Sequence, residues 1–365
     1  MPARLHVSEN VSLASMTTLG VGGDARYFAR VTSEAQVRAA VAWADARNLP
    51  WTVLGGGSNV VVADEGIDGL VLQPDLRGWE VDDSSGRVRL RVGAGESWDS
   101  LVALAVERGW GGVECLSAIP GTVGAAPIQN IGAYGQEVCE TIVEVRALDT
   151  VRDEPCTLPA DACGFGYRTS RFRSGDMSRA VVVAVAFELR ADARATVRYA
   201  ELAQLLSRQS PPNLCEVREA VFALRRRKSM VAEPGDPYAR SAGSFFVNPV
   251  VDDQEYAELV VRARSRGWIG AREEPPHHEA GEMKKLSAAW LIERAGFCRG
   301  FERGAVGLSP HHALAIINRG GATARDVIAL ARDVQAAVGE QCGVVLKAEP
   351  VFLGLSPEIL ASLTP

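Results

Sequence analysis

The stretch "IPGTVGAAPIQNIGAYGQE" (residues 119–137) is a long segment rich in Gly, Ala, Pro and Asn, with the composition of a loop. Loops of this length without secondary structure of their own are usually functional or disordered, and this one is too apolar for disorder. Its small residues let the backbone approach a ligand closely, as expected of a wall around a flat ring system. A purely structural role is the alternative.

A second glycine-rich stretch, "VLGGGSNVVV" (53–62), reads as a strand that breaks into a turn and resumes. The glycines at 55–57 allow a sharp turn that presents successive N–H groups to an anion, and Ser58 and Asn59 add side-chain donors. A strand follows instead of a helix, so the dinucleotide fingerprint does not apply. A tight hairpin without a ligand is the alternative.

A third glycine-rich turn, "TTLGVGGDARYF" (17–28), is also uncharged over its glycines. It is weak evidence alone. Together with residues 53–62, it suggests two loops from neighbouring strands that close on one phosphate-bearing ligand.

The composition limits the classes to which the protein can belong. A chain of 365 residues should hold two or three domains. The net charge of −6 and the short basic run at 225–228 give no footprint for nucleic acid. No segment approaches the ~20 apolar residues of a membrane span, so we expect no membrane partner. Seven scattered cysteines without a CxxC pair read as reduced thiols of a cytosolic protein.

The two histidine pairs, His277-His278 and His311-His312, lack metal-ligand spacing with any cysteine or carboxylate. We therefore expect no metal site.

Residues 1–85 alternate between strand and helix patterns, and residues 35–48 have the apolar period of an amphipathic helix. Over 88–109 a strand pattern leads into a helix with Ser97 as its N-cap. Further elements are expected as strands over 141–150 and 179–189 and as a helical stretch around 198–230.

The last long helix is expected to begin at Thr323, which forms a capping box with Asp326, and to end at Gly339. Its apolar stripe consists of Val327, Leu330, Ala331, Val334 and Val338. The final segment, "VVLKAEPVFLG" (344–354), reads as a strand that rejoins an earlier sheet.

Three single residues are candidates for chemistry. Arg168 in "CGFGYRTSRFR" (163–173) suits a planar anion such as a carboxylate or an enolate. Ser244 in "SAGSFFVNPVV" (241–251) is either a turn serine or a proton donor in a dry pocket. Glu349 lies in a strand pattern, where a buried carboxylate would indicate function and an exposed edge position would not.

Taken in order, these motifs resemble the UDP-N-acetylenolpyruvoylglucosamine reductase family over almost the whole chain. The matching motifs are "LGGGSNV", "IPGTVGAAPIQNIGAYGQE", "FGYR", "AGSFFVNP", "AAWLIERAG", "HHALAIIN" and a final L-x-x-E.

The resemblance implies an α+β fold of the vanillyl-alcohol-oxidase (PCMH-type) class. In such a fold, two FAD-binding subdomains accompany an inserted α+β substrate-binding domain. We expect subdomain 1 at 1–85, subdomain 2 at 86–230, the substrate-binding domain at 231–340, and a C-terminal strand at 341–365 that returns to the FAD-binding region with the catalytic Glu.

The implied reaction belongs to bacterial peptidoglycan precursor synthesis. NADPH, the co-substrate, reduces non-covalently bound FAD, and the enolpyruvyl sugar nucleotide then receives a hydride from flavin N5 and a proton on the neighbouring carbon. The resemblance also implies a cytoplasmic enzyme that acts on a small UDP-sugar. We expect a monomer or a weak homo-oligomer.

The resemblance also assigns roles to residues. Ser244 is the proton donor, in a pocket made by the neighbouring glycine and phenylalanines, and Arg168 and Glu349 stabilise the carboxylate and the enolate. The substrate-binding residues are Tyr199, Lys228 and Asn248. The FAD-binding residues are Gly55, Gly56, Gly57, Ser58, Asn59, Pro120, Gly121, Gly124, Ala125, Ile131 and Gly132.

Two features depart from the family pattern. Pro350 follows Glu349 where many members have Pro-Glu-Val-Arg, so the strand hydrogen bonds should change and the Arg is missing. The linker before Ser244 also looks longer than in compact members, which affects the placement of Lys228.

Two rival functions remain at this point. An oxidase on the same FAD fold often tethers its flavin through His or Cys, and no His lies near residues 53–62. A nucleotide-binding regulatory module would leave Ser244, Arg168 and Glu349 without a common purpose.

Overall fold

A computed structural model describes residues 5–83, 86–191, 194–206, 211–231, 233 and 235–363. They belong to two compact units. Unit 1 is Met1–Val11, Ala25–Gly57 and Asp68–Arg227; unit 2 is Ser12–Asp24, Ser58–Ile67 and Lys228–Pro365. The predicted boundary after residue 230 lies three residues from the last of these divisions, while the boundaries after 85 and 340 stay predictions.

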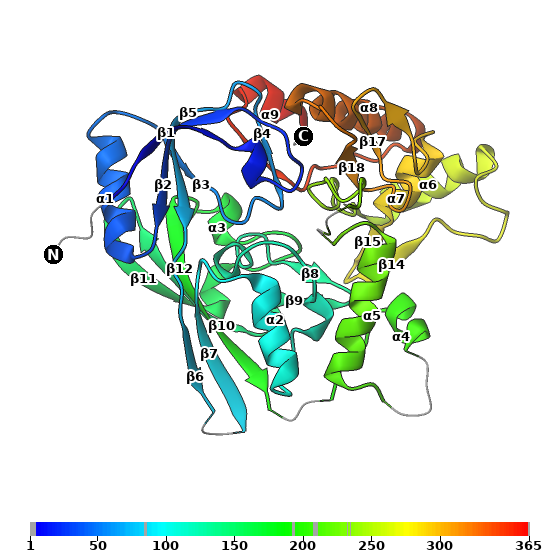
Figure 1. The fold of residues 1–365 in the computed structure, drawn as a ribbon. Helices are drawn as coiled ribbons and strands as arrows, with labels where there is room; N and C mark the ends of the chain where they lie inside the picture. Colours follow the sequence, from blue (N-terminus) through cyan, green and yellow to red (C-terminus); the bar gives the residue numbers. More distant parts are fainter. Residues whose placement is uncertain are drawn as a thin grey trace. The chain divides into compact units, whose positions relative to one another are not determined.

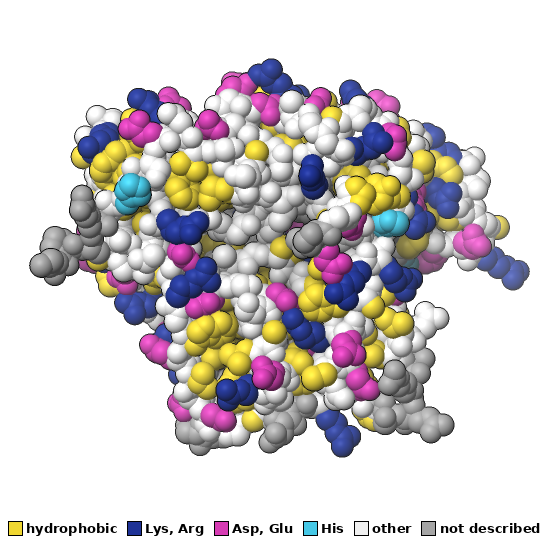
Figure 2. Space-filling model, in the orientation of Figure 1, with side chains coloured by type: hydrophobic (Ala, Val, Ile, Leu, Met, Phe, Trp, Pro, Cys, Tyr) yellow, Lys and Arg dark blue, Asp and Glu magenta, His cyan; other side chains and the backbone are white. Residues whose placement is uncertain are grey.

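The surface carries both signs of charge. Figure 2 shows Lys and Arg side chains interspersed with Asp and Glu on the face that it presents, in line with the net charge of −6. Of the helices in the described ranges, none is both long enough and apolar enough to cross a bilayer.

One sheet of unit 1 has the strand order β1-β2-β5-β3 and is covered by helix α1, Glu34–Asp45. The helix packs on the sheet because Val37 and Ala40 join one apolar cluster with Leu70 and Leu72. Ser33 caps the helix by accepting a hydrogen bond from the Gln36 N–H. The strands are β1 (Ser8–Ser12), β2 (Asp24–Val31), β3 (Trp51–Val53) and β5 (Ile67–Pro74).

The second sheet of unit 1 is antiparallel, with the order β11-β10-β12-β7-β6. Helix α2 (Trp98–Glu107) follows β7 and packs on this sheet, with Trp98 and Leu101 buried against Phe187 of β12 (Figure 1). Ser97 caps the helix, as predicted. The strands are β6 (Trp79–Asp82), β7 (Arg87–Gly93), β10 (Ile142–Asp149), β11 (Glu154–Pro159) and β12 (Ala180–Arg190).

The loop at 119–137 contains the 3-10 turn η3 (Val123–Ala125) and the short hairpin β8 (Gly132–Ala133) and β9 (Gln136–Glu137). Other elements of unit 1 are the 3-10 turns η2 (Glu114–Leu116), η4 (Val138–Glu140) and η5 (Ala160–Cys163), and helix α3 (Arg171–Ser174). The helical stretch expected around 198–230 is two helices, α4 (Ala200–Leu205) and α5 (Leu214–Arg227). The pair Pro211-Pro212, placed directly before α5, accounts for separate helices because proline cannot continue a helix from its N-terminal side.

Unit 2 is built around helix α8 (Ala324–Cys342), which shares one apolar cluster with α6, α7 and the β17 and β18 strands. Its predicted stripe is buried. The 3-10 turn is η1 (Ala14–Met16) and the other helices are α6 (Asp253–Ser265), α7 (Ala288–Arg294) and α9 (Pro357–Leu363). The strands are β4 (Val60–Val62), β13 (Val250–Val251), β14 (His277–Ala280), β15 (Met283–Leu286), β16 (Glu302–Arg303), β17 (Val306–Leu308), β18 (Ile316–Asn318) and β19 (Val351–Leu353).

Helix α8 begins as predicted but ends four residues later than expected. The capping box of Thr323 and Asp326 is present. Gly339 lies inside the helix, and the C-cap is Gly343, whose φ of 74° is left-handed. The helix continues past Gly339 because Cys342, only 2% exposed, completes the apolar stripe. The prediction of Gly339 as the end was therefore wrong.

The segment at 344–354 is mostly not a strand. Only β19 (Val351–Leu353) is, and it pairs in parallel with β4. Since β3 pairs with β5 instead, residues 53–62 do not form the tight hairpin of the alternative interpretation.

Pro350 lies where the chain changes its partner. The Glu349 N–H donates to the Phe245 carbonyl at 2.9 Å, and the Val351 N–H donates to the Asn59 carbonyl at 2.9 Å. Neither of these contacts uses an N–H at position 350, so the proline fits there.

The two glycines near the end of α8 should respond to alanine in opposite directions. Nothing lies within 4 Å of a Cβ placed at Gly339, so Gly339→Ala should stabilise the protein by about 1 kcal/mol. Gly343→Ala should destabilise it by about 1–2 kcal/mol, because its φ is left-handed and its Cβ would meet Arg262 at 3.2 Å. Urea denaturation of both variants measures this, and a stabilised Gly343→Ala would contradict the assigned helix end.

Candidate active site

The backbone of residues 240–247 is held on two sides within unit 2. On one side, the Phe245 N–H donates to the Leu314 carbonyl at 2.7 Å and the Asn318 N–H donates to the Arg240 carbonyl at 2.9 Å. On the other side, the Phe245 carbonyl accepts from the Glu349 N–H at 2.9 Å. Ser244 therefore lies on a segment that runs between the one carrying His312 and the one carrying Glu349.

The side chain of Ser244 meets a histidine. Its Oγ lies 3.3 Å from Nε2 of His312, and both residues are partly buried. The backbone pairing described above sets this contact, because residues 240–247 run antiparallel to residues 312–318. Sequence reasoning gave His312 no role. Its place in the motif "HHALAIIN" was the available signal.

The phenylalanines next to Ser244 belong to the core of unit 2. Phe245 and Phe246 are 0% and 1% exposed and belong to the apolar core of unit 2. Their burial in this core holds the backbone next to Ser244 in place. Gly243 has a φ of 75°, which turns the chain into Ser244 in a conformation that suits glycine.

Two other predicted residues of unit 2 have defined contacts. The Asn59 side chain donates from Nδ2 to the Glu349 carbonyl at 3.3 Å, which ties a predicted FAD residue to a predicted catalytic one. The Asn248 Oδ1 accepts from the Ala288 N–H at 3.0 Å at the start of α7. Asn248 thus stabilises a helix terminus in addition to any role toward substrate.

The segment at 17–23 lies against the second half of the 53–62 stretch, although β2, which follows it, neighbours β1 and β5 and neither β3 nor β4. Thr18 Oγ1 donates to the Ser58 carbonyl at 3.3 Å, and the Gly23 N–H donates to the Ala63 carbonyl at 2.8 Å. A Cβ on Gly22 would come within 2.5 Å of Val62. The glycine is required by this close approach.

In unit 1, the glycine turn at 55–57 packs directly on the loop at 119–137. A Cβ on Gly56 would lie 2.7 Å from the Gly121 Cα, and one on Gly55 would lie 3.2 Å from Thr122 Oγ1. Gly124 is equally close to Ala94. Two loops that the sequence singled out separately thus pack against each other, backbone on backbone.

Arg168 contacts the far end of the same loop. It sits in a two-residue turn at φ 55°, closed by hydrogen bonds between Gly166 and Thr169. Its guanidinium donates to the Gly132 carbonyl at 2.6 Å and to the Asn130 carbonyl at 3.4 Å. A Cβ on Gly132 would lie 2.9 Å from the guanidinium, so a larger residue there would shift the guanidinium. Gly132, predicted as an FAD-binding residue, therefore also helps to position Arg168.

The remaining predicted residues are placed as follows. Tyr199 precedes α4, and its ring packs edge-on against Tyr134 with ring centroids 5.4 Å apart. Lys228 follows the last residue of α5 and is partly buried. Ile131 packs against the apolar cluster of the second sheet, and Pro120 precedes Gly121 in the same loop.

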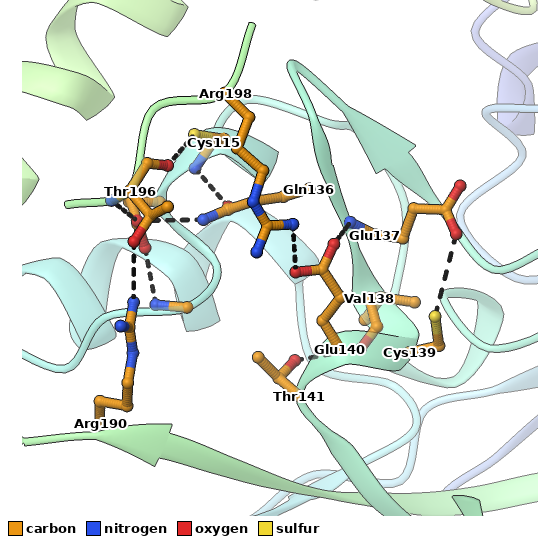
Figure 3. A network of polar contacts seen from close by, with 12 residues as sticks. Cys115, Gln136, Glu137, Val138, Cys139, Glu140, Thr141, Arg190, Thr196 and Arg198 are labelled. Atoms are coloured by element: carbon orange, nitrogen blue, oxygen red, sulfur yellow. Dashed lines mark hydrogen bonds and ion pairs between the residues drawn. The ribbon is translucent and has the colours of Figure 1, made fainter. Parts of the chain in front are cut away.

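A cavity of about 490 Å³ opens elsewhere in unit 1. Its lining includes Gln136, Glu140, Glu188, Arg190, Thr196 and Arg198, and it contains none of the predicted catalytic or cofactor residues. Its rim is a network of polar contacts (Figure 3).

Comparison with known proteins shows the family to which the chain belongs. Residues 236–353 match the family model described as UDP-N-acetylenolpyruvoylglucosamine reductase, C-terminal domain, and residues 25–151 match that of an FAD binding domain. The UDP-N-acetylenolpyruvoylglucosamine reductase of Thermobifida fusca is 49% identical over 356 residues, which cover 96% of this chain and 98% of that protein. The chain belongs to the UDP-N-acetylenolpyruvoylglucosamine reductase family.

Further members of this family agree with the assignment. The Streptomyces coelicolor reductase is 46% identical over 94% of this chain and 89% of its own length. The crystal structure of the Thermus caldophilus reductase is 25% identical, with a TM-score of 0.62 over 96% of this chain and all of that one. These matches confirm the predicted α+β fold class with an FAD-binding domain of the vanillyl-alcohol-oxidase type.

The residues in unit 1 fit FAD. In the described part of the chain, the N–H groups of Gly55, Gly56 and Gly57 donate to no protein group, and the turn has no Cβ to cover them. Such a run of amides suits the diphosphate of a dinucleotide. Gly55–Gly57, Pro120, Gly121, Gly124 and Ala125 would hold that part of FAD.

A methyl group at position 56 should therefore disturb FAD binding. Gly56→Ala brings a Cβ to 2.7 Å from the Gly121 backbone, which must then move away from the glycine turn. We expect purified Gly56→Ala protein to lose most of its flavin, measured as the ratio of absorbance at flavin and protein wavelengths. Gly339→Ala, in a helix with open space around it, is the control. Full flavin content in Gly56→Ala would contradict the site.

Proposed function

We propose that this chain is a flavoenzyme that uses NADPH to reduce UDP-N-acetylglucosamine enolpyruvate to UDP-N-acetylmuramate in peptidoglycan precursor synthesis. Membership of the reductase family and the FAD-binding domain support the reaction class. The observation that carries the mechanism is the segment at 240–247, which places the Ser244 hydroxyl at His312 and pairs with Glu349 on its other side.

The chemistry makes defined demands on the side chains. FAD held by the loops of unit 1 would supply the redox chemistry, in which NADPH is the source of the hydride that is added to the vinyl methylene carbon of the substrate. Negative charge then develops next to the substrate carboxylate. A cation and a hydrogen-bonding group must stabilise that charge where it forms.

Arg168 is the proposed cation. Its planar guanidinium has five N–H donors, and carbonyl contacts to the loop at 130–132 hold it in a fixed orientation. A carboxylate or an enolate oxygen matches the fork of such a group. Glu349 is the proposed second group, and its backbone is fixed from both sides by Phe245 and Asn59.

Ser244 is the proposed acid. A serine hydroxyl is a weak acid in water, but an enolate-like intermediate is a strong carbon base, so transfer needs mainly a fixed geometry. The core packing of Phe245 and Phe246 and the contact with His312 supply that geometry. On this proposal Ser244 is the proton donor and not a turn serine.

The substrate nucleotide would be bound by Tyr199, Lys228 and Asn248. The proposed compartment is the cytoplasm, which fits seven cysteines kept as free thiols. We propose a monomer or a weak homo-oligomer.

Ser244→Ala should separate the two half-reactions. The variant should keep bound FAD and normal reduction by NADPH, while reoxidation by the enolpyruvyl sugar nucleotide slows by at least ~10²–10⁴-fold. Stopped-flow absorbance of the flavin measures both steps. Ser265→Ala, which alters an exposed serine on α6, is the control. Normal turnover by Ser244→Ala would remove the proton-donor role.

The substrate itself is tested anaerobically. The protein is bleached with one equivalent of NADPH, and UDP-N-acetylglucosamine enolpyruvate is then added. Return of the yellow colour with this substrate supports the reductase. Recolouring only with oxygen would instead indicate an oxidase on the same fold. Absence of flavin would favour a regulatory module.

A further inference from the structure

A buried carboxylate in unit 1 takes no part in the proposed chemistry. Glu114 is 0% exposed and lies in the 3-10 turn η2. It accepts hydrogen bonds from the Gly112 N–H at 2.7 Å, the Gln136 side-chain amide at 3.0 Å and the Thr196 N–H at 3.4 Å. These donors are neutral; Gly112 is two residues away in sequence, whereas Gln136 and Thr196 are 22 and 82 residues away. A buried charge held in this way is costly to remove and fixes the groups around it.

The third donor belongs to residues 194–199, here called the strap, which enters helix α4 at Tyr199. Both the N–H and the carbonyl of Thr196 make contacts. Its N–H donates to Glu114, and its carbonyl lies 3.9 Å from the Cys115 Sγ. Burial, with the Glu114 charge adding to it, raises the pKa of the Cys115 thiol to about 12, so the thiol keeps the proton that it donates.

Gln136 connects Glu114 and Cys115, the two residues that contact Thr196 of the strap. Its amide nitrogen donates to Glu114, and its oxygen accepts from the Cys115 N–H at 2.8 Å. Figure 3 shows Thr196 facing Cys115 and Gln136, and Arg198 reaching Glu140. The Arg198–Glu140 ion pair of 3.0 Å adds a contact at the exposed side of the strap.

The far end of the strap rests on the β8–β9 turn. A Cβ on Gly135, at φ 81°, would lie 3.1 Å from the Arg198 Cβ and 3.4 Å from the Tyr199 N. The Tyr199 ring packs on Tyr134 of the same turn. The position of Tyr199 is therefore set by contacts that lead back to Glu114 through four residues of strap.

We propose that Glu114 is a positioning residue for the substrate: it holds the strap so that Tyr199 is presented to the nucleotide part of the UDP-sugar. This inference rests on the proposed function, and it adds a residue to which the reaction itself gives no role. Glu114 acts through Tyr199 and touches neither the reacting atoms nor the flavin. Its loss should therefore affect substrate binding before it affects redox chemistry.

Glu114→Gln tests this with little change in shape. One of the two oxygens becomes an NH₂ group, so at least one of the three N–H donors loses its acceptor. We expect KM for UDP-N-acetylglucosamine enolpyruvate to rise about tenfold, the effect of one lost hydrogen bond. The flavin content and the rate of flavin reduction by NADPH should stay as in the wild type.

A double-variant cycle distinguishes positioning from a general loss of structure. Tyr199→Ala should raise KM by a similar factor, and adding Glu114→Gln to it should have little further effect, because both changes remove the same contact. The control is Glu188→Gln, since Glu188 lines the same cavity but pairs with Arg87 instead of the strap. It should leave KM unchanged.

Gly135→Ala provides a second route if Glu114→Gln does not fold. It displaces the strap from the opposite side without altering Glu114, and it should raise KM without an additional effect in the Tyr199→Ala background. A wild-type KM in the folded variant, additive effects with Tyr199→Ala, or an equal loss of flavin reduction would each overturn the inference. Wild-type protein that fails to turn over the substrate would instead overturn the proposed function, and this inference with it.

Discussion

The geometry of the candidate site depends on the hydrogen bonds that hold residues 240–247 on both sides. Phe245 contributes its N–H to Leu314 and its carbonyl to Glu349, so one residue fixes the spacing of three chain segments. Phe245 and Phe246 are buried beneath that point, which removes the freedom to slide or rotate. A hydroxyl that must deliver a proton to carbon needs this rigidity, because a weak acid gains its efficiency from position. The contact with His312 follows from the same backbone pairing.

In unit 1, glycine residues allow two loops of the candidate FAD site to pack closely against each other. A Cβ at Gly56 would come within 2.7 Å of the Gly121 backbone, and a Cβ at Gly132 would come within 2.9 Å of the Arg168 guanidinium. Backbone therefore packs on backbone in the two loops, and within the described residues the N–H groups of the turn at 55–57 have no protein acceptor. The same residue type satisfies both the packing and the approach of a ligand, so a glycine-rich sequence alone could not distinguish the two. The structure shows that both reasons apply together.

Features decided by local sequence were predictable. The caps at Ser97 and Thr323 and the stripe of α8 depend on residues within a few positions of each other, and the structure contains them. The end of α8 was misplaced because Gly339 and Gly343 are chemically identical. The choice between them depends on Cys342, which is buried by distant residues of the core. In the same way, the motif that contains His312 did not show what its side chain contacts, since its partner Ser244 lies 68 residues away.

The roles of single residues depend on such distant partners more than on their neighbours in sequence. Pro350 looked like a disruption of a strand, yet it stands between two hydrogen bonds that go to different segments, where no N–H is required. Glu114 lies in a stretch to which sequence reasoning assigned no role, yet its carboxylate accepts hydrogen bonds from donors 22 and 82 positions further along the chain. Burial of the Glu114 carboxylate requires hydrogen-bond donors, and each of its three neutral donors offsets part of its desolvation. That requirement fixes the segments that carry the donors relative to one another. It is the physical reason that a residue remote from the chemistry can set the position of Tyr199.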